Sequence, residues 1–202
     1  MIVIIQARSG SKRLKNKVLT YINQKPLIWY VINQVKKSKN VKKIVIAIPK
    51  KNSDNKLYQY LKKKYDVYRG DEINVAKRMM CAAKKYNAKF FTRISADSPL
   101  INPKLIDQFI KERKKNKNYD IITNVFPRTF ASGQSIEIIK TKILEKNIKF
   151  MKKNELEHVT KFFYKNYKKF KIKNILNKSK KKLIKNSVDT QNDLKKLKHL
   201  IK

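Results

Sequence analysis

Apolar and polar residues alternate along the chain in blocks that predict strands followed by helices. Short apolar runs rich in β-branched residues predict buried strands over 2–5 and 43–48, and further strands are expected over 67–68, 90–95 and 120–124. Apolar residues at helical spacing predict helices over 26–37 and 103–115. Between them, one helix is expected to end near residue 65, and another to follow the turn at 69–72, with Ile73 on its inner side. Ser53 or Asp54 is expected to cap the helix that ends near residue 65.

The alternation loosens after residue 124. Residues 126–135 read as an irregular segment, followed by a strand over 136–139 and a helix over 141–148. An amphipathic stretch over 155–167, a half-exposed strand over 170–175 and a last helix over 193–201 complete the chain. This order predicts one α/β domain over 1–202, with a mostly parallel sheet, helices on both of its faces, and ligands outside the carboxyl ends of the strands.

The loop after the first strand carries the chemistry of a phosphate site. Gly10 allows backbone amides to approach an anion, and two serines add hydroxyl donors. Three cations accompany them, and they neutralise charge of the kind a triphosphate carries. The loop residues are Arg8, Ser9, Gly10, Ser11, Arg13 and Lys17. An ordinary polar loop in a basic chain is the alternative, but two serines and a glycine among the cations favour a phosphate cradle.

Acidic residues are the informative minority, because Asp and Glu number 14 against 52 Lys and Arg. Asp97 directly follows a buried strand, and Asp189 lies in a short Val-Asp-Thr segment that can return to the same edge of the sheet. Two carboxylates above a phosphate loop are suited to Mg²⁺. Taken singly, each has an alternative: Asp97 as a turn or capping residue, and Asp189 as the cap of the last helix.

The formal net charge of +38 raises nucleic-acid binding as a rival function. Only seven of the basic residues are arginines, and the lysines are spread over most of the predicted helices, so a general lysine enrichment explains the charge better than a patch. Cys81 is a lone cysteine, and no apolar run has membrane-spanning length. We therefore expect a cytoplasmic protein without membrane association. The glycines do not fit a Walker loop or a dinucleotide-binding loop.

Four segments together resemble one known family. Residues 4–19 read IIQARSGSKRLKNKVL, residues 93–101 read RISADSPLI, residues 157–160 read EHVT, and residues 188–190 read VDT. They are similar, in the right order, to signatures of the cytidylyltransferases that activate acidic sugars, within the branch named for spore-coat polysaccharide biosynthesis. The matches span nearly the whole chain.

The resemblance implies a three-layer, Rossmann-like (GT-A-like) nucleotidyltransferase fold and a reaction between CTP and an acidic sugar. The anomeric hydroxyl of the sugar attacks the α-phosphorus of CTP with the help of Mg²⁺, giving a CMP-sugar and pyrophosphate. It also implies a homodimer, and assigns catalysis to Arg13, Lys17 and Asp97 and the metal to Asp97 and Asp189. The implied nucleotide contacts are Gln6, Ala7, Arg8, Ser9, Gly10, Ser11, Arg13, Lys17 and Ser95. The weaker substrate contacts are Arg69, Gln134, Glu137 and His158. A lone histidine on a helix is more often a packed or solvated residue, and Arg69 reads equally well as a surface arginine beside Asp71 and Glu72.

Two departures from the family pattern bear on substrate choice. Lys12, Lys15 and Asn16 stand where the branch commonly has Thr, Pro and Gly, which makes the loop more basic. Ser132 and Ser135 stand where the branch tends to have Asp, which leaves the identity of the sugar open. A nucleotidyltransferase that uses another nucleoside triphosphate remains the alternative within the enzyme class.

Overall fold

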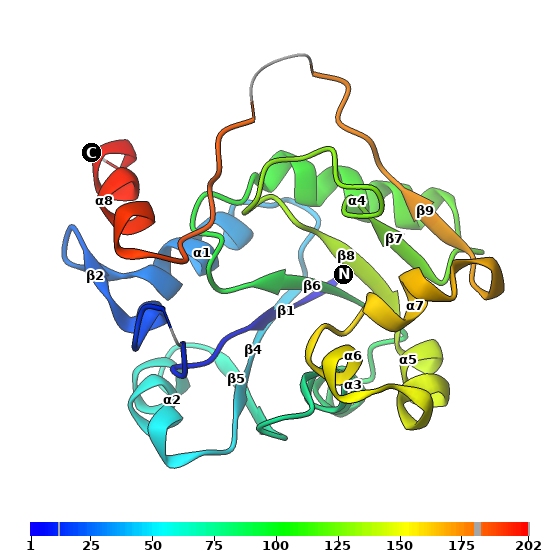
Figure 1. Ribbon diagram of the computed structural model, residues 1–202, viewed down its shortest axis with the longest axis horizontal. Coiled ribbons are helices and arrows are strands. Elements are labelled where there is room, and N and C mark those ends of the chain that lie inside the picture. The colour runs from blue at the N-terminus through cyan, green and yellow to red at the C-terminus, as the bar shows by residue number, and fades with distance from the viewer. Residues whose placement is uncertain (12, 180–182, 202) are drawn as a thin grey trace.

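The computed structural model describes residues 1–11, 13–179 and 183–201, and within them a seven-stranded sheet forms the centre of the molecule (Figure 1). Its strands are β1 (Ile2–Gln6), β4 (Lys43–Pro49), β5 (Asp66–Gly70), β6 (Phe90–Ser95), β7 (Ile121–Thr123), β8 (Glu137–Lys140) and β9 (Ile172–Asn174). Their order is β5-β4-β1-β6-β8-β7-β9. β8 runs antiparallel to β6 and β7, and the other neighbours are parallel, so the predicted mostly parallel sheet is confirmed.

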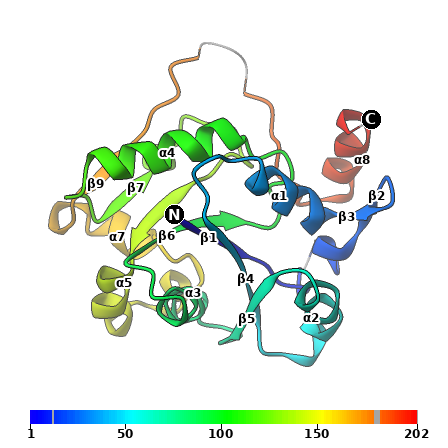
Figure 2. The ribbon, with the colours of Figure 1, turned by 180° about the vertical axis from the view of Figure 1, so that it is seen from behind.

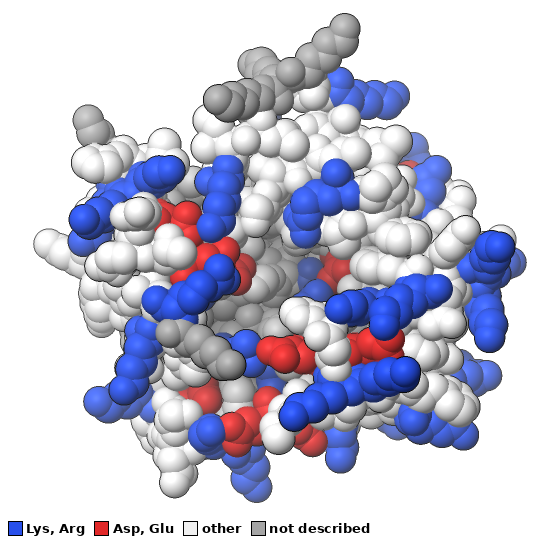
Figure 3. Space-filling model, viewed as in Figure 1, with Lys and Arg blue, Asp and Glu red and all other residues white. Residues whose placement is uncertain are grey.

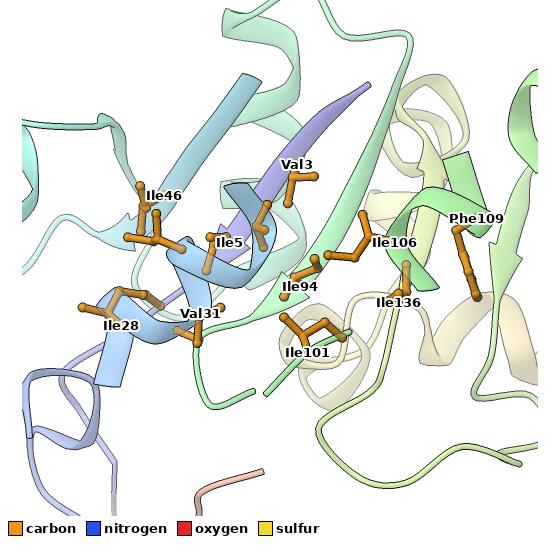
Figure 4. Close-up of a cluster of buried hydrophobic side chains, with 14 of the residues drawn as sticks. Val3, Ile5, Ile28, Val31, Ile46, Ile94, Ile101, Ile106, Phe109 and Ile136 are labelled. Atoms are coloured by element: carbon orange, nitrogen blue, oxygen red, sulfur yellow. The ribbon is translucent and has the colours of Figure 1, made fainter. Parts of the chain in front are cut away.

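Helices cover both faces of the sheet, as the sequence predicts (Figure 2). One face packs against α1 (Leu27–Lys36), α2 (Asn55–Lys62) and α4 (Pro103–Lys115). The other packs against α3 (Val75–Lys85), α5 (Thr141–Asn147), α6 (Lys153–Glu157) and α7 (Lys161–Lys165). Side chains of β1 alternate between the two cores: Val3 and Ile5 enter the first, shown in Figure 4, and Ile4 enters the second.

A third, smaller apolar cluster joins the two ends of the chain. It packs α8 (Gln191–Leu200) against a hairpin of β2 (Tyr21–Ile22) and β3 (Lys25–Pro26). The sequence pattern did not predict this hairpin, because its strands have two residues each and its turn contains no glycine. Asn23 and Gln24 supply the positive φ angles of 43° and 65° instead.

Two expectations about the helices are wrong. His158 does not lie within a helix, because the stretch over 155–167 is divided: α6 ends at Glu157 and α7 begins at Lys161. The Thr160 hydroxyl between the two helices donates to Glu137. Ile73 precedes α3 and is 67% exposed, so it does not belong to the core. Among the described residues, no helix has the length and apolar character needed to cross a membrane.

Candidate functional site

The predicted phosphate loop emerges at the centre of the carboxyl edge of the sheet. β1 lies between β4 and β6, and the ladder continues past its end, since Ala7 N donates to Ala47 O and Ala96 N donates to Gln6 O. The loop is therefore held from both sides where the neighbouring strands end. Cavities of about 700 Å³ and 560 Å³ open beside it, and both are lined by Arg8, Gly10 and Ser11.

Most of the predicted site residues meet in the larger cavity. It is lined by Gln6, Ala7, Arg8, Gly10, Ser11, Arg13, Lys17, Val18, Ser95, Ala96, Asp97, Glu157, His158 and Asp189. Figure 3 shows a hollow in the middle of this face with acidic side chains gathered around it, while Lys and Arg are spread over the surrounding surface. Three of the acidic residues, Asp97, Glu157 and Asp189, line the larger cavity itself.

Asp97 and Asp189 converge on one ammonium group. Lys17 Nζ lies 3.4 Å from Asp97 Oδ2 and 3.3 Å from Asp189 Oδ1, and Arg13 Nη2 lies 3.3 Å from the same Asp189 oxygen. The two segments are also joined by their backbones, because Val188 N donates to Asp97 O at 2.9 Å. Burial raises the pKa of Asp189, but the charges and hydrogen bonds of Lys17 and Lys185 outweigh it, so the pKa is lowered overall. Asp189 is therefore an anion at neutral pH.

This pair of carboxylates fits Mg²⁺. Mg²⁺ commonly takes one or two carboxylates and completes its octahedral shell with water and substrate phosphate oxygens. No group of three or more His, Cys, Asp or Glu side chains able to hold a metal occurs within the described ranges, so an all-protein cage is not what these residues form. The donor set instead matches a metal that arrives with a phosphate ligand.

Hydrogen bonds from the segment around Gly133 help to position Asp189, a role that the sequence did not predict. Asn186 N donates to Ser132 O at 2.7 Å, the Ser132 and Ser187 hydroxyls lie 2.8 Å apart, and Ser187 Oγ donates to Asp189 Oδ2 at 3.3 Å. Gly133 has φ of +94°, and a Cβ there would lie 2.5 Å from Asn186 C. The glycine was the available signal, because close backbone approach requires it.

Ser9 faces the smaller cavity, whose wall adds residues that the sequence did not identify. Ser9 N donates to Asp54 Oδ1 at 2.7 Å, so Asp54 anchors the phosphate loop and makes no side-chain cap for α2. The cavity is lined by Arg8, Ser9, Gly10, Ser11, Lys15, Asn16, Pro49, Lys51, Ser53, Asp54, Glu72, Ile73 and Glu157. Exposed Ile73 thus supplies apolar surface to a cavity wall. Lys12, one of the departures in the loop, lies outside the described residues.

Buried Arg78 supports the wall of this smaller cavity. Its Nη1 donates to the backbone oxygens of Asp71 and Glu72, and its side chain is only 1% exposed. Burial lowers the pKa of Arg78 to about 10, with a further lowering by Arg8. Its remaining nitrogens find no partner among the described residues. The guanidinium thereby holds the turn that presents Glu72 and Ile73.

Two predicted substrate contacts lie elsewhere. Arg69 Nη2 donates to Lys51 O and to Asn55 Oδ1, so it ties a turn to the start of α2. The Gln134 amide donates to Leu100 O and accepts from Asn102 N, so it joins two loops. Neither residue lines the cavities described here.

Glu137 lies at a third cavity, of about 320 Å³, which shares Ser95 and His158 with the larger one. This third cavity is lined by Arg93, Ser95, Val125, Arg128, Ser135, Glu137, His158, Thr160, Lys161 and Tyr164. Because β8 is antiparallel, its first residue, Glu137, pairs with Arg93 near the end of β6. Exposed His158 lies where the two cavities meet.

Comparison with known proteins shows a similarity over almost the whole chain. Residues 2–200 match the family model described as Cytidylyltransferase. A solved cytidylyltransferase from Leptospira borgpetersenii is 31% identical with a TM-score of 0.93, covering 99% of this chain and 86% of that one.

Three curated relatives match over shorter stretches. An uncharacterized protein of Methanocaldococcus jannaschii is 35% identical over 72% of this chain and 59% of its own length. The spore coat polysaccharide biosynthesis protein SpsF of Bacillus subtilis is 30% identical, covering 61% of this chain and 54% of SpsF. The 3-deoxy-manno-octulosonate cytidylyltransferase of Lawsonia intracellularis is 32% identical, covering 54% and 43%. The matches thus span about half the length of these relatives.

Proposed function

The chain belongs to the cytidylyltransferase family, and from this premise we propose that it transfers CMP from CTP to the anomeric hydroxyl of an acidic sugar. The observation that carries the proposal is the meeting of the phosphate loop, Asp97 and Asp189 in one cavity that shares Ser95 and His158 with the third cavity. We call the third cavity the acceptor compartment. A triphosphate and a second substrate require adjoining spaces of this kind. Similarity to an octulosonate cytidylyltransferase and to a polysaccharide biosynthesis protein supports an acidic sugar destined for a surface polysaccharide.

The reaction joins the two substrates at the α-phosphorus. The anomeric oxygen forms a bond to that phosphorus, and the bond between the α-phosphorus and the bridging oxygen to the β-phosphate breaks, so that pyrophosphate leaves with the bridging oxygen. The hydroxyl releases its proton to water. Arg13 and Lys17 neutralise charge on the phosphates, and the backbone at Gly10 allows their close approach. Gln6, Ala7, Arg8, Ser9, Ser11 and Ser95 complete the proposed nucleotide contacts.

Asp97 and Asp189 would hold Mg²⁺, which when bound supplies positive charge to the triphosphate and its transition state. Before the ion binds, Lys17 has a second role, because its ammonium lies between both carboxylates and limits their mutual repulsion. His158 and Glu137 keep their proposed place beside the acceptor. Glu137 acts through Arg93, Thr160 and Tyr164 rather than as a free carboxylate.

Three general features complete the proposal: the domain organisation, the oligomeric state and the location. We treat residues 1–202 as a single nucleotidyltransferase domain that forms a homodimer. A cytoplasmic location follows from the proposed substrate CTP, which is a cytoplasmic metabolite. Lysines spread over the surface, with acidic groups around the hollow, favour this small-molecule function over nucleic-acid binding (Figure 3).

The test is pyrophosphate release from CTP, Mg²⁺ and a panel of octulosonic and nonulosonic acids. ATP, GTP and UTP in parallel reactions distinguish CTP from other nucleotides. Asp97→Ala should lower turnover at least about 100-fold, because the carboxylate is proposed to hold the metal. Asp66→Ala removes the same charge from an exposed ion pair on β5 and should leave turnover unchanged. Silence across the panel, or full turnover by Asp97→Ala, would refute the proposal.

A further inference from the structure

Three cations and one carboxylate line the acceptor compartment. Arg93, Arg128 and Lys161 are the cations, and Glu137 is the carboxylate. The balance among them decides which charge the compartment prefers in a bound molecule. The reasoning that follows rests on the proposed function, since it concerns the second substrate of that reaction.

Glu137 is fully committed to its protein neighbours. It is 4% exposed, forms an ion pair with Arg93, and accepts hydrogen bonds of 2.6 Å from the Thr160 and Tyr164 hydroxyls. Burial raises its pKa, but Arg93 and these hydrogen bonds outweigh burial and lower the pKa overall. Glu137 therefore stays ionised and offsets Arg93, which also donates to Gln6.

Arg128 and Lys161 have neutral partners instead. Arg128 Nη1 donates to Ser135 Oγ at 2.9 Å, and Lys161 Nζ donates to Asn154 Oδ1 at 2.6 Å. Within the described ranges, no acidic side chain forms an ion pair with either cation. The compartment therefore carries two positive charges that no protein group offsets. The two come from separate elements, Arg128 from the loop between β7 and β8 and Lys161 from the first turn of α7.

We propose that Arg128, assisted by Lys161, binds the carboxylate of the acceptor sugar, and that Ser135 keeps the Arg128 guanidinium available for it. A neutral hydroxyl occupies one nitrogen of the guanidinium without offsetting its charge. The remaining donors match the two oxygens of a carboxylate in a bidentate arrangement. An acidic residue at 135 would itself pair with the Arg128 guanidinium in place of the substrate carboxylate. Arg128, Lys161 and Ser135 are thus specificity-determining residues for an acidic over a neutral acceptor.

The first experiment measures steady-state kinetics with the panel acid that the wild type uses fastest and with its uncharged carboxamide. Arg128→Gln should raise KM for the acid at least tenfold, because a charge-assisted bidentate contact is lost, and should change KM for CTP less than twofold. Lys161→Gln should raise KM for the acid about threefold. KM for the carboxamide should not respond to either change. Lys111→Gln removes the same charge from the exposed side of α4 and is the matched control.

Ser135→Asp tests the role of the hydroxyl. Its new carboxylate should pair with Arg128 and raise KM for the acid as much as Arg128→Gln does, with KM for CTP retained. Ser135→Ala keeps the guanidinium free of an acid and should stay within about threefold of the wild type. An unchanged KM for the acid in Arg128→Gln, or equal wild-type use of the acid and the carboxamide, overturns this inference while leaving cytidylyl transfer intact.

Calorimetry separates this inference from the proposed function. The acids are titrated into protein with CMP and Mg²⁺ present, so that the nucleotide space is filled and no transfer occurs. Binding that Arg128→Gln weakens at least tenfold supports the carboxylate contact even if no panel member is turned over. Absence of binding of any acid to the wild type overturns the contact, whatever the turnover shows.

Discussion

Replacing Lys17 by Met tests the electrostatics on which the candidate metal site depends. The Lys17 side chain is 12% exposed, and its ammonium lies 3.3 and 3.4 Å from two carboxylate oxygens. At an effective dielectric constant near 20, each pair has a gross attraction of about 5 kcal/mol. Desolvation and partial exposure offset most of it, and charged hydrogen bonds contribute roughly 1.5–3 kcal/mol net. We expect Lys17→Met to lose about 2 kcal/mol of unfolding free energy at pH 7.

The loss should depend on pH in a defined direction. Lys17 and Lys185 lower the folded-state pKa of Asp189 below its ordinary value, against the opposing effect of burial. The stability that comes from this lowering is present above about pH 4, the unfolded pKa, and disappears as pH falls through the folded pKa. The unfolding curves of wild type and Lys17→Met should therefore approach each other below pH 4.

Mg²⁺ should partly replace the missing ammonium. A two-carboxylate site with a Kd of about 1 mM gains about 1.4 kcal/mol at 10 mM free Mg²⁺ by mass action. In the wild type Lys17 competes with the ion, so its gain should be smaller. The assay is urea unfolding of the protein without nucleotide, with and without Mg²⁺. Lys111→Met is the matched control, and adding Asp97→Asn to Lys17→Met should abolish the Mg²⁺ effect.

Two results would refute this reasoning. The first is a Lys17→Met protein as stable as the wild type at pH 7, which would show that the carboxylates do not need the ammonium. The second is an Mg²⁺ effect on Lys17→Met no larger than that on Lys111→Met, which would show that the carboxylate pair does not bind the ion.

Three further variants test how the site is supported. Gly133→Ala should cost at least about 2 kcal/mol and weaken turnover, because its Cβ would lie 2.5 Å from the backbone of Asn186 and φ is +94°; normal unfolding and turnover would contradict this. Arg78→Met should raise KM for CTP severalfold, because the turn at 71–73 loses its donors, and Arg78→Lys should raise it less. Equal KM values in both variants would argue against positioning by the guanidinium. Thr190→Val should cost about 1 kcal/mol by removing the side-chain cap of α8, measured by urea unfolding, whereas an unchanged midpoint would mean that this cap does not stabilise the fold.

Local sequence determined the order of the elements and the kind of chemistry. The β-branched runs at β1 and β4 are buried on both faces, and such runs identify central parallel strands without knowledge of their partners. The loop with Arg8, Gly10 and Arg13 could be interpreted because an anion site requires a strand end, a glycine and cations in one short segment. Asp97 was recognisable for a similar reason, since it directly follows a buried strand.

The tertiary structure decided which residues that are far apart in the sequence contact one another at the site, and which polar residues of nearby loops make other contacts. Asp189 reaches Asp97 because α8 packs on a hairpin whose two-residue strands give no periodic signal, and because the backbone at Gly133 supports residues 186 and 187. Gln134 and Arg69 are polar residues near the right strands, but their donors are used by backbone oxygens and a neighbouring Asn55 side chain. The charge of Arg128 is not offset, because the side chain to which it donates is the neutral hydroxyl of Ser135. A hydrogen bond between residues far apart in sequence depends on distances that no local pattern encodes. For that reason the phosphate loop and Asp97 were predictable, whereas the contacts that support Asp189 and surround Glu137 were not.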